Sequence, residues 1–159
     1  MTTAHEALKR SRLAPELTEQ QLDTLAAYVT LRELADGQVL VPEGTSDNHL
    51  YGLMSGALAV VRNAGKPDAV TLFTLTAGDL VGELSFIDDT PHYASLVAAG
   101  PVRVFGLERE KLESLLDSHP QIVYRVMRAI VRTAHQIQRR LSMQSVELTN
   151  YIYKQHGKY

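Results

Sequence analysis

The spacing of hydrophobic residues changes twice along the chain. In the first part, apolar residues recur every three or four positions and predict an amphipathic helix, at Leu22, Leu25, Ala26 and Val29. Thr18 lies just before this run and can cap the helix, and Gln21, three residues later, completes a capping box. We expect the helix to begin after Thr18 and to end near Val29 or Thr30.

From residue 31 to about residue 107, short apolar runs alternate with glycine-containing turns. The turns read Asp-Gly, Glu-Gly, Ser-Gly and Ala-Gly. Strands at such short, regular intervals predict an antiparallel sandwich or barrel. The segment "RNAGKPDA" reads as a hairpin loop between two strands. Five glycines stand where turns need a positive φ, namely Gly37, Gly44, Gly56, Gly65 and Gly78.

After Gly106 the pattern becomes helical again. The segment "EREKLESLLDSH" predicts a short amphipathic helix, and Pro120 suits the first turn of a second, long helix that we expect to reach about Gln155. Apolar positions alternate between spacings of three and four along it, at Met127, Ile130, Ala134, Ile137, Leu141, Gln144, Leu148 and Tyr151. Such a heptad seam indicates a homodimer formed through this helix. The alternative is that the helix packs only on its own barrel.

Two further features of the long helix bear on its surroundings. Gln144 on the seam would be a polar interruption that fixes the register of the two helices. A basic stripe repeats on the opposite side, at Arg125, Arg128, Arg132, His135 and Arg139. We interpret the stripe as a solvated outer face, with an anion or protein docking surface as the alternative.

Composition and charge narrow the class of protein. The 159 residues, 45% hydrophobic and 21% charged, suit a single globular domain. We divide it into an N-terminal helical segment (1–30), a β-roll (31–107) and C-terminal helices (108–155). There is no cysteine and no apolar stretch of membrane-spanning length, so we expect a cytoplasmic protein without membrane contact. A net charge of −2 argues against a general nucleic-acid binder.

Residues that could support catalysis or metal binding are sparse. His49, His92, His119 and His135 lack the spacing of metal ligands, and the serines lack the context of an activated nucleophile. We therefore expect neither an enzyme nor a metal site.

Two segments carry a family resemblance. "DGQVLVPEGTSDNHLYGLMSGALAV" has a glycine turn, a short strand, a second glycine and an aromatic-containing strand, and "GDLVGELSF" with "TPHYASLVA" is similar to a phosphate-binding cassette. From about Thr18 to Leu141, the chain resembles the cyclic nucleotide-binding domain family. The resemblance implies an α+β fold, in which an antiparallel, jelly-roll-like β-roll (a double-stranded β-helix) is flanked by an N-terminal helix and a long C-terminal helix.

The resemblance also implies a ligand site. In the family, backbone N–H groups of the cassette and an arginine hold the cyclic phosphate, and a glutamate accepts a hydrogen bond from the ribose 2′-hydroxyl. Gly82 matches the cassette glycine and Glu83 matches the ribose-binding glutamate, while Leu84 and Ser85 would supply N–H groups. The implied ligand is cAMP or cGMP, with residues near Ile137 and Gln138 close to its base.

The cassette departs from the family where the arginine should stand. His92 takes that place, and Tyr93 replaces the small residue that follows. A charge-assisted hydrogen bond contributes about 1.5–3 kcal/mol, so its loss weakens phosphate binding by about ten- to a few-hundredfold. Histidine replaces it only in part because it is mostly neutral at pH 7. Asp88 and Asp89 should further oppose an anion at the entrance.

Two readings of the site stay open at this point. In one, the chain is a sensor that binds a cyclic nucleotide or a related small phosphate ligand and signals through its long helix. In the other, His92 and Tyr93 close a degenerate pocket, Glu83 and His92 contact each other, and the fold serves as a dimerisation or docking module. The chain stops at Tyr159, so we expect no helix-turn-helix after the long helix and no direct DNA binding by this chain.

Overall fold

A computed structural model describes residues 3–156 of the chain. The helical elements are α1 (Ala4–Lys9), the 3-10 helix η1 (Ala14–Glu16), α2 (Glu19–Ala26), α3 (Glu83–Asp88), α4 (Arg109–Glu113) and α5 (Pro120–His156). The strands are β1 (Val29–Leu34), β2 (Val39–Val41), β3 (His49–Arg62), β4 (Val70–Leu75), β5 (Leu80–Val81) and β6 (Ser95–Glu108). Within the described residues, no helix is both long enough and apolar enough to cross a membrane.

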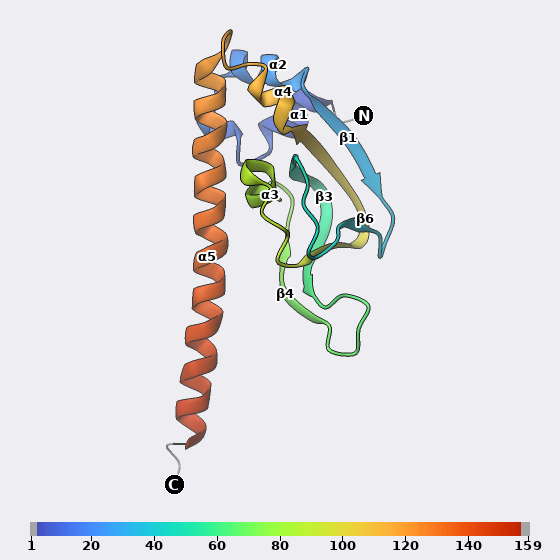
Figure 1. Cartoon of the computed structure of the whole chain (residues 1–159), viewed down its shortest axis with the longest axis vertical. Helices are drawn as coiled ribbons and strands as arrows, with labels where there is room; N and C mark the ends of the chain where they lie inside the picture. The colour runs from blue at the N-terminus through green and yellow to red at the C-terminus, as the bar shows by residue number, and fades with distance from the viewer. Residues whose placement is uncertain (1–2, 157–159) are drawn as a thin grey trace.

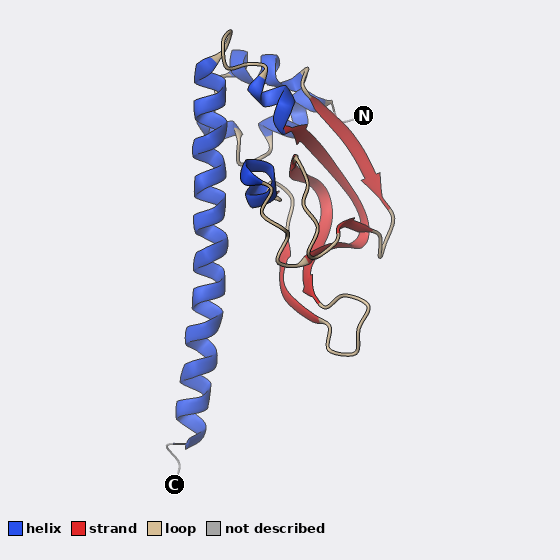
Figure 2. Cartoon of the chain, viewed as in Figure 1, coloured by secondary structure: helices blue, strands red, loops and turns tan. Residues whose placement is uncertain are grey.

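The strands form one six-stranded sheet in which every printed pairing is antiparallel. Its main path runs β1-β6-β3-β4, while β2 pairs with β6 and β5 pairs with β3. The two long strands, β3 and β6, pair from His49 opposite Glu108 to Val61 opposite Ser95 and bend at two register shifts. Figures 1 and 2 show the sheet curling into a roll, with α5 standing along one side and running past it. The predicted α+β fold class is confirmed.

The N-terminal segment contains more helices than its pattern of apolar residues predicted. The capping box at Thr18 and Gln21 forms in both directions, at 3.0 and 3.2 Å. The helix ends at Ala26, earlier than predicted, because Val29 already pairs with Leu107 in the sheet. Helix α1 was not predicted, although a second capping box at Thr3 and Glu6 marks its start.

Two hydrophobic clusters position the site. One lies inside the roll and includes Leu53, Leu58 and Val104. The other joins the N-terminal helices and α4 to the first half of α5, which contributes Ile122, Val126, Ala129 and Ile130. The first half of α5 is therefore fixed to the body of its own chain.

Gly52 and Gly106, which both lie in strands, allow a matched test of the packing around the Phe105 ring. A Cβ at Gly52 would lie 2.1 Å from the fully buried ring of Phe105, whereas one at Gly106 would meet nothing nearer than 3.5 Å. We expect Gly52→Ala to lower the free energy of unfolding by about 1–3 kcal/mol, because the ring has nowhere to move. Gly106→Ala should leave it nearly unchanged. Urea denaturation measures both, and equal effects would contradict the packing.

The predicted dimer seam does not lie on one exposed face of α5. Ile130 and Ile137 are buried in their own chain, and Gln144 donates a hydrogen bond from Nε2 to the Leu72 carbonyl at 2.6 Å. Gln144 therefore fixes α5 to β4, which matches the alternative that the helix packs on its own barrel. A different heptad stripe contains only exposed and half-buried residues, and we call it the exposed stripe: Tyr124, Met127, Val131, Ala134, Gln138, Leu141, Ser145 and Leu148.

The basic stripe is also not simply a solvated face. Arg128 and Arg132 form ion pairs with the buried carboxylate of Glu16, at 3.3 and 2.6 Å. Glu16 belongs to η1, so these two arginines tie the N-terminal segment to α5. The stripe therefore has a structural role on this side of the helix.

Candidate functional site

A glycine in the left-handed conformation opens the cassette. Gly82 connects β5 to α3 with φ of 84° and caps α3. A Cβ there would lie 3.2 Å from the His49 carbonyl oxygen and 3.5 Å from the Tyr51 ring, and the positive φ strains any larger residue. The turn places Glu83 at the first position of α3.

A small cavity lies between the cassette and the roll. Its enclosed volume is about 30 Å³, and two larger grooves of about 530 and 280 Å³ adjoin it between α3 and α5. Glu83 and Leu84 line all three spaces. The cavity is lined by Val60, Val81, Gly82, Glu83, Leu84, Thr90, Pro91, His92, Tyr93, Ala94, Leu96 and Ile137. Five of the six predicted site residues therefore meet there, together with one side chain of α5.

Glu83 is the buried acid of this cavity, with 5% of its surface exposed. Burial raises the pKa of its carboxyl, and a hydrogen bond with its own backbone acts in the opposite direction. Within residues 3–156, no side chain forms a hydrogen bond or an ion pair with it. The Glu83–His92 contact that would have explained this acid structurally is therefore not present, and the carboxylate stays available as an acceptor.

His92 lies against the start of the cassette helix. Its ring carbon Cε1 would be 3.9 Å from a Cβ on Gly82, and its Nε2 is buried without a hydrogen-bond partner among the described residues. Backbone hydrogen bonds of 2.8 Å to Gly44 and Thr45 hold it there. Burial lowers the pKa of the imidazole, and the charge of Asp47 opposes this shift. The burial of His92 therefore favours its neutral form.

Tyr93 narrows the cavity. The side chain is half-buried and packs against the hydrophobic cluster inside the roll. Burial, followed by the charge of Glu83, raises the pKa of its phenol to about 12. The ring of Tyr93 is one of the side chains that line this small cavity.

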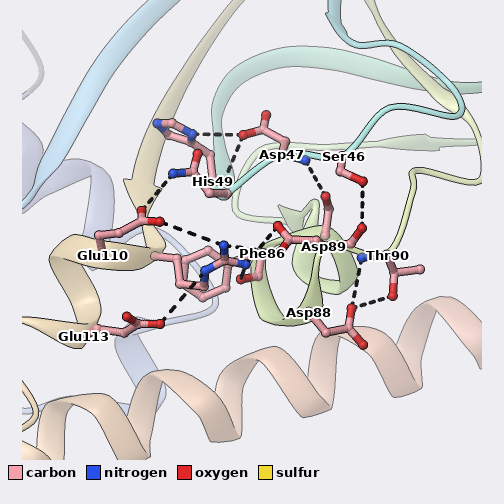
Figure 3. Close-up of polar contacts among 12 residues, drawn as sticks. Ser46, Asp47, His49, Phe86, Asp88, Asp89, Thr90, Glu110 and Glu113 are labelled. Carbon is pink, nitrogen blue, oxygen red and sulfur yellow. Dashed lines mark hydrogen bonds and ion pairs between the residues drawn. The ribbon is translucent and has the colours of Figure 1, made fainter.

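Ser85 does not line the cavity. Its side chain is fully buried on the other side of α3, where the hydroxyl accepts a hydrogen bond from the Asp47 backbone N–H. Asp47 also accepts hydrogen bonds from His49 and from the Tyr51 hydroxyl, at 3.0 and 2.8 Å. This cluster, part of which Figure 3 shows, fixes α3 and the turn at Gly82 from behind.

The acids that were expected to repel an anion are engaged elsewhere. Asp88 accepts hydrogen bonds from the backbone and the hydroxyl of Thr90, and Asp89 forms an ion pair of 3.1 Å with Arg109 (Figure 3). Arg109 also donates a hydrogen bond to the Phe86 carbonyl at 3.2 Å. Sequence reasoning missed Arg109, because only the fold brings the start of α4 to the end of α3.

Arg109 should hold the end of the cassette helix in place. We expect Arg109→Gln to speed backbone amide exchange at residues 86–90, because the bonds of Arg109 to Phe86 and Asp89 at this end of α3 are lost. Arg62→Gln is the control, since it breaks an ion pair with Glu43 that involves no residue of α3. Hydrogen exchange with mass spectrometry compares the two variants, and equal protection of α3 in both would contradict this role.

Glu83 is the only carboxylic acid among the described residues that line the cavity and its two adjoining grooves. Neither the cavity nor the two adjoining grooves has a lysine or arginine among its described lining residues. The described part of the chain also contains no cluster of side chains suited to a metal ion. The site can thus accept hydrogen bonds at a buried carboxylate and offer N–H groups at the start of α3, but it presents no fixed positive charge.

The chain matches one protein family and is similar to several curated proteins. Residues 31–119 match the family described as "Cyclic nucleotide-binding domain". The chain is 26% identical over 140 residues to the cyclic AMP receptor protein of Thermus thermophilus, covering 88% of this chain and 65% of that protein. It is 30% identical over 125 residues to glutaminase 1 of Bradyrhizobium diazoefficiens, covering 79% of this chain and 20% of that protein.

A solved structure shares the fold over most of its length. The cyclic nucleotide-binding domain from Methylobacillus flagellatus KT superposes with a TM-score of 0.81 at 21% identity, covering 92% of this chain and 86% of that one. Against the curated relatives the chain spans less, between a fifth and two thirds of their length. With the family match covering more than half of its residues, the chain belongs to the cyclic nucleotide-binding domain family.

Proposed function

We propose that this chain is a regulatory sensor domain that binds a cyclic nucleotide, such as cAMP or cGMP, or a related small phosphate ligand in its β-roll. The ligand occupies the cavity and the adjoining groove, and α5 carries the signal. We further propose that the domain acts in the cytoplasm by binding rather than catalysis, without membrane contact or direct DNA binding of its own.

One observation supports this proposal above the others. Gly82, Glu83, His92 and Tyr93 line the same cavity as Ile137 of α5. A ligand held by the cassette would therefore touch the helix that transmits the signal. Because a ligand shifts a conformational equilibrium only through unequal contacts with its states, this shared lining is what a sensor of this kind requires.

The site gives specific expectations for each part of the ligand. The backbone N–H groups at the start of α3 suit the phosphate, and the buried carboxylate of Glu83 suits a ribose hydroxyl. The enclosed 30 Å³ is too small for a nucleotide, so the base would lie in the groove beside Gln138 and Tyr93 would turn aside. Binding should consequently be weaker than with an arginine in the cassette.

Titration calorimetry tests the proposal directly. Heat with one-to-one stoichiometry on adding cAMP or cGMP is the expected result. Glu83→Ala should lose that heat, whereas Glu147→Ala, which removes an exposed carboxylate of α5 remote from the cavity, should keep it. Absence of heat at millimolar ligand would contradict the sensor function.

The second candidate function is a dimerisation or docking module without a nucleotide. Its support is the position of Tyr93, which packs on the core of the roll and leaves little enclosed space. Under this function the cavity stays closed at any concentration of nucleotide, and only the exposed stripe of α5 is used.

The exposed stripe supports self-association under either function. Tyr124 and Val131 are 54% and 63% exposed, and with Met127 they form an apolar groove on the first half of α5. Heptad spacing continues through Leu141 to Leu148, which is 61% exposed. We propose that two copies pair along this stripe as a homodimer.

A further inference from the structure

The charges around the cavity do not balance for an anionic ligand. Glu83, when ionised, places one negative charge in a buried site, and a cyclic phosphate would bring a second. No described lysine or arginine lines the cavity or the grooves that adjoin it. Arg109, beside the cassette, is already bound to Asp89 and to the Phe86 carbonyl. A positive side chain in this site would therefore have to be one that gains a proton.

His92 is the group placed to gain it. Its Nε2 is buried without a described partner, so no internal acceptor competes for a new proton. Its ring lies against Gly82, at the N-terminal end of α3 where the phosphate would sit. An adjacent phosphate favours the protonated imidazole, and the resulting N–H would donate a charge-assisted hydrogen bond.

The groups that face His92 allow this change. Glu83 lies across the same cavity, Tyr93 follows in the chain, and Asp47 acts on the ring from the loop before β3. Asp47 accepts hydrogen bonds from His49 and Tyr51, and its charge acts to raise the pKa of the His92 ring. The other elements present uncharged lining residues, at Val60, Val81, Leu84, Ala94, Leu96 and Ile137.

We propose that the cavity takes up one proton with each anionic ligand and that His92 carries it, so that the domain responds to ligand and pH together. This inference rests on the proposed function, because it needs the cavity to bind a phosphate. One proton gives the occupied site one positive and two negative charges, which is the balance that an arginine would provide permanently.

The sign of the pH dependence follows from the two states of His92. Burial lowers the pKa of the imidazole in the ligand-free protein, and a bound phosphate raises it. The complex then binds more protons than the free protein between these two values. Affinity should rise as pH falls through this window, by up to about tenfold per pH unit, and level off on either side.

Calorimetry in several buffers counts the protons. cAMP is titrated into the protein at pH 6, 7 and 8 in three phosphate-free buffers that differ in ionisation enthalpy. The slope of observed heat against that enthalpy should approach one proton within the window. His92→Arg should bind more tightly, with a slope near zero and an affinity independent of pH. Glu83→Gln should keep the slope wherever it still binds.

The outcomes separate this inference from the proposed function. Binding by the unmodified protein with no proton uptake at any pH would overturn the inference and leave the sensor function standing. An equal uptake by His92→Arg would also overturn it, because the proton would then go to another group. Absence of heat from both proteins at all three pH values would overturn the sensor function, and the inference with it.

Discussion

Replacing His92 by arginine and Tyr93 by alanine in the same chain should raise the affinity for a cyclic nucleotide by about ten- to a few-hundredfold. The guanidinium would supply a permanent positive charge beside Gly82, where the neutral imidazole now lies. Removal of the Tyr93 ring would open the enclosed 30 Å³ toward the groove. Titration calorimetry at pH 7 measures the change.

The two single variants show how much of the gain in affinity comes from the added positive charge and how much from removal of the Tyr93 ring. His92→Arg alone should give the larger gain if charge limits binding, and Tyr93→Ala alone if the ring blocks entry. His119→Arg is the control for added charge, since His119 is exposed before α5 and lies outside the cavity. A double variant that binds no more tightly than the unmodified chain would contradict the reading of this site as a weakened phosphate cassette.

Placing an aspartate on the exposed stripe should break the proposed homodimer. Val131 is 63% exposed and lies in the apolar groove beside Tyr124 and Met127. Loss of its burial removes about 1.5 kcal/mol per copy, and two-fold symmetry doubles this, so Val131→Asp should raise the dissociation constant by about a hundredfold or more. Light scattering after size-exclusion chromatography reads the mass directly.

Val146→Asp is the matched control for this experiment. It makes the same substitution at a valine of similar exposure, 53%, that lies outside the stripe on the same helix. The control should remain a dimer. Equal dissociation of both variants, or a monomeric unmodified protein, would show that the exposed stripe is not the interface.

Local sequence patterns predicted most of the secondary structure. The capping box at Thr18, the helix start at Pro120 and the positive φ of the five turn glycines are all confirmed, because each depends on residues only a few positions apart. The cassette residues Gly82 and Glu83 came from the family resemblance of one continuous segment. Their meeting with His92 and Ile137 followed from the resemblance.

The sequence could not decide which face of α5 the body covers. Two heptad frames share Met127, Ala134, Leu141 and Leu148 and differ only in whether the intervening position is three or four residues away. Burial of Ile130 and Ile137 by their own chain selects the second frame, which runs through Val131. Tertiary packing, which local spacing does not contain, makes this choice.

Contacts between segments that lie far apart in the chain also could not be predicted from the sequence. The sequence placed Arg128 and Arg132 on a solvated stripe. In the structure, both form ion pairs with the buried Glu16 of η1. Arg109 reaches Asp89 across 20 positions of the chain, so Asp89 was expected to repel an anion that it does not face. For each of these arginines, the sequence did not show which carboxylate forms the ion pair.

Hydrogen exchange on the protein with and without saturating cAMP tests the central claim most directly, that an occupied cavity acts on α5. The measurement follows residues 83–93 of the cassette and residues 130–145 of α5 in the same sample. We predict slower exchange in the cassette together with a change around Ile137. Protection confined to the cassette, or no change in either segment at millimolar ligand, would contradict the account.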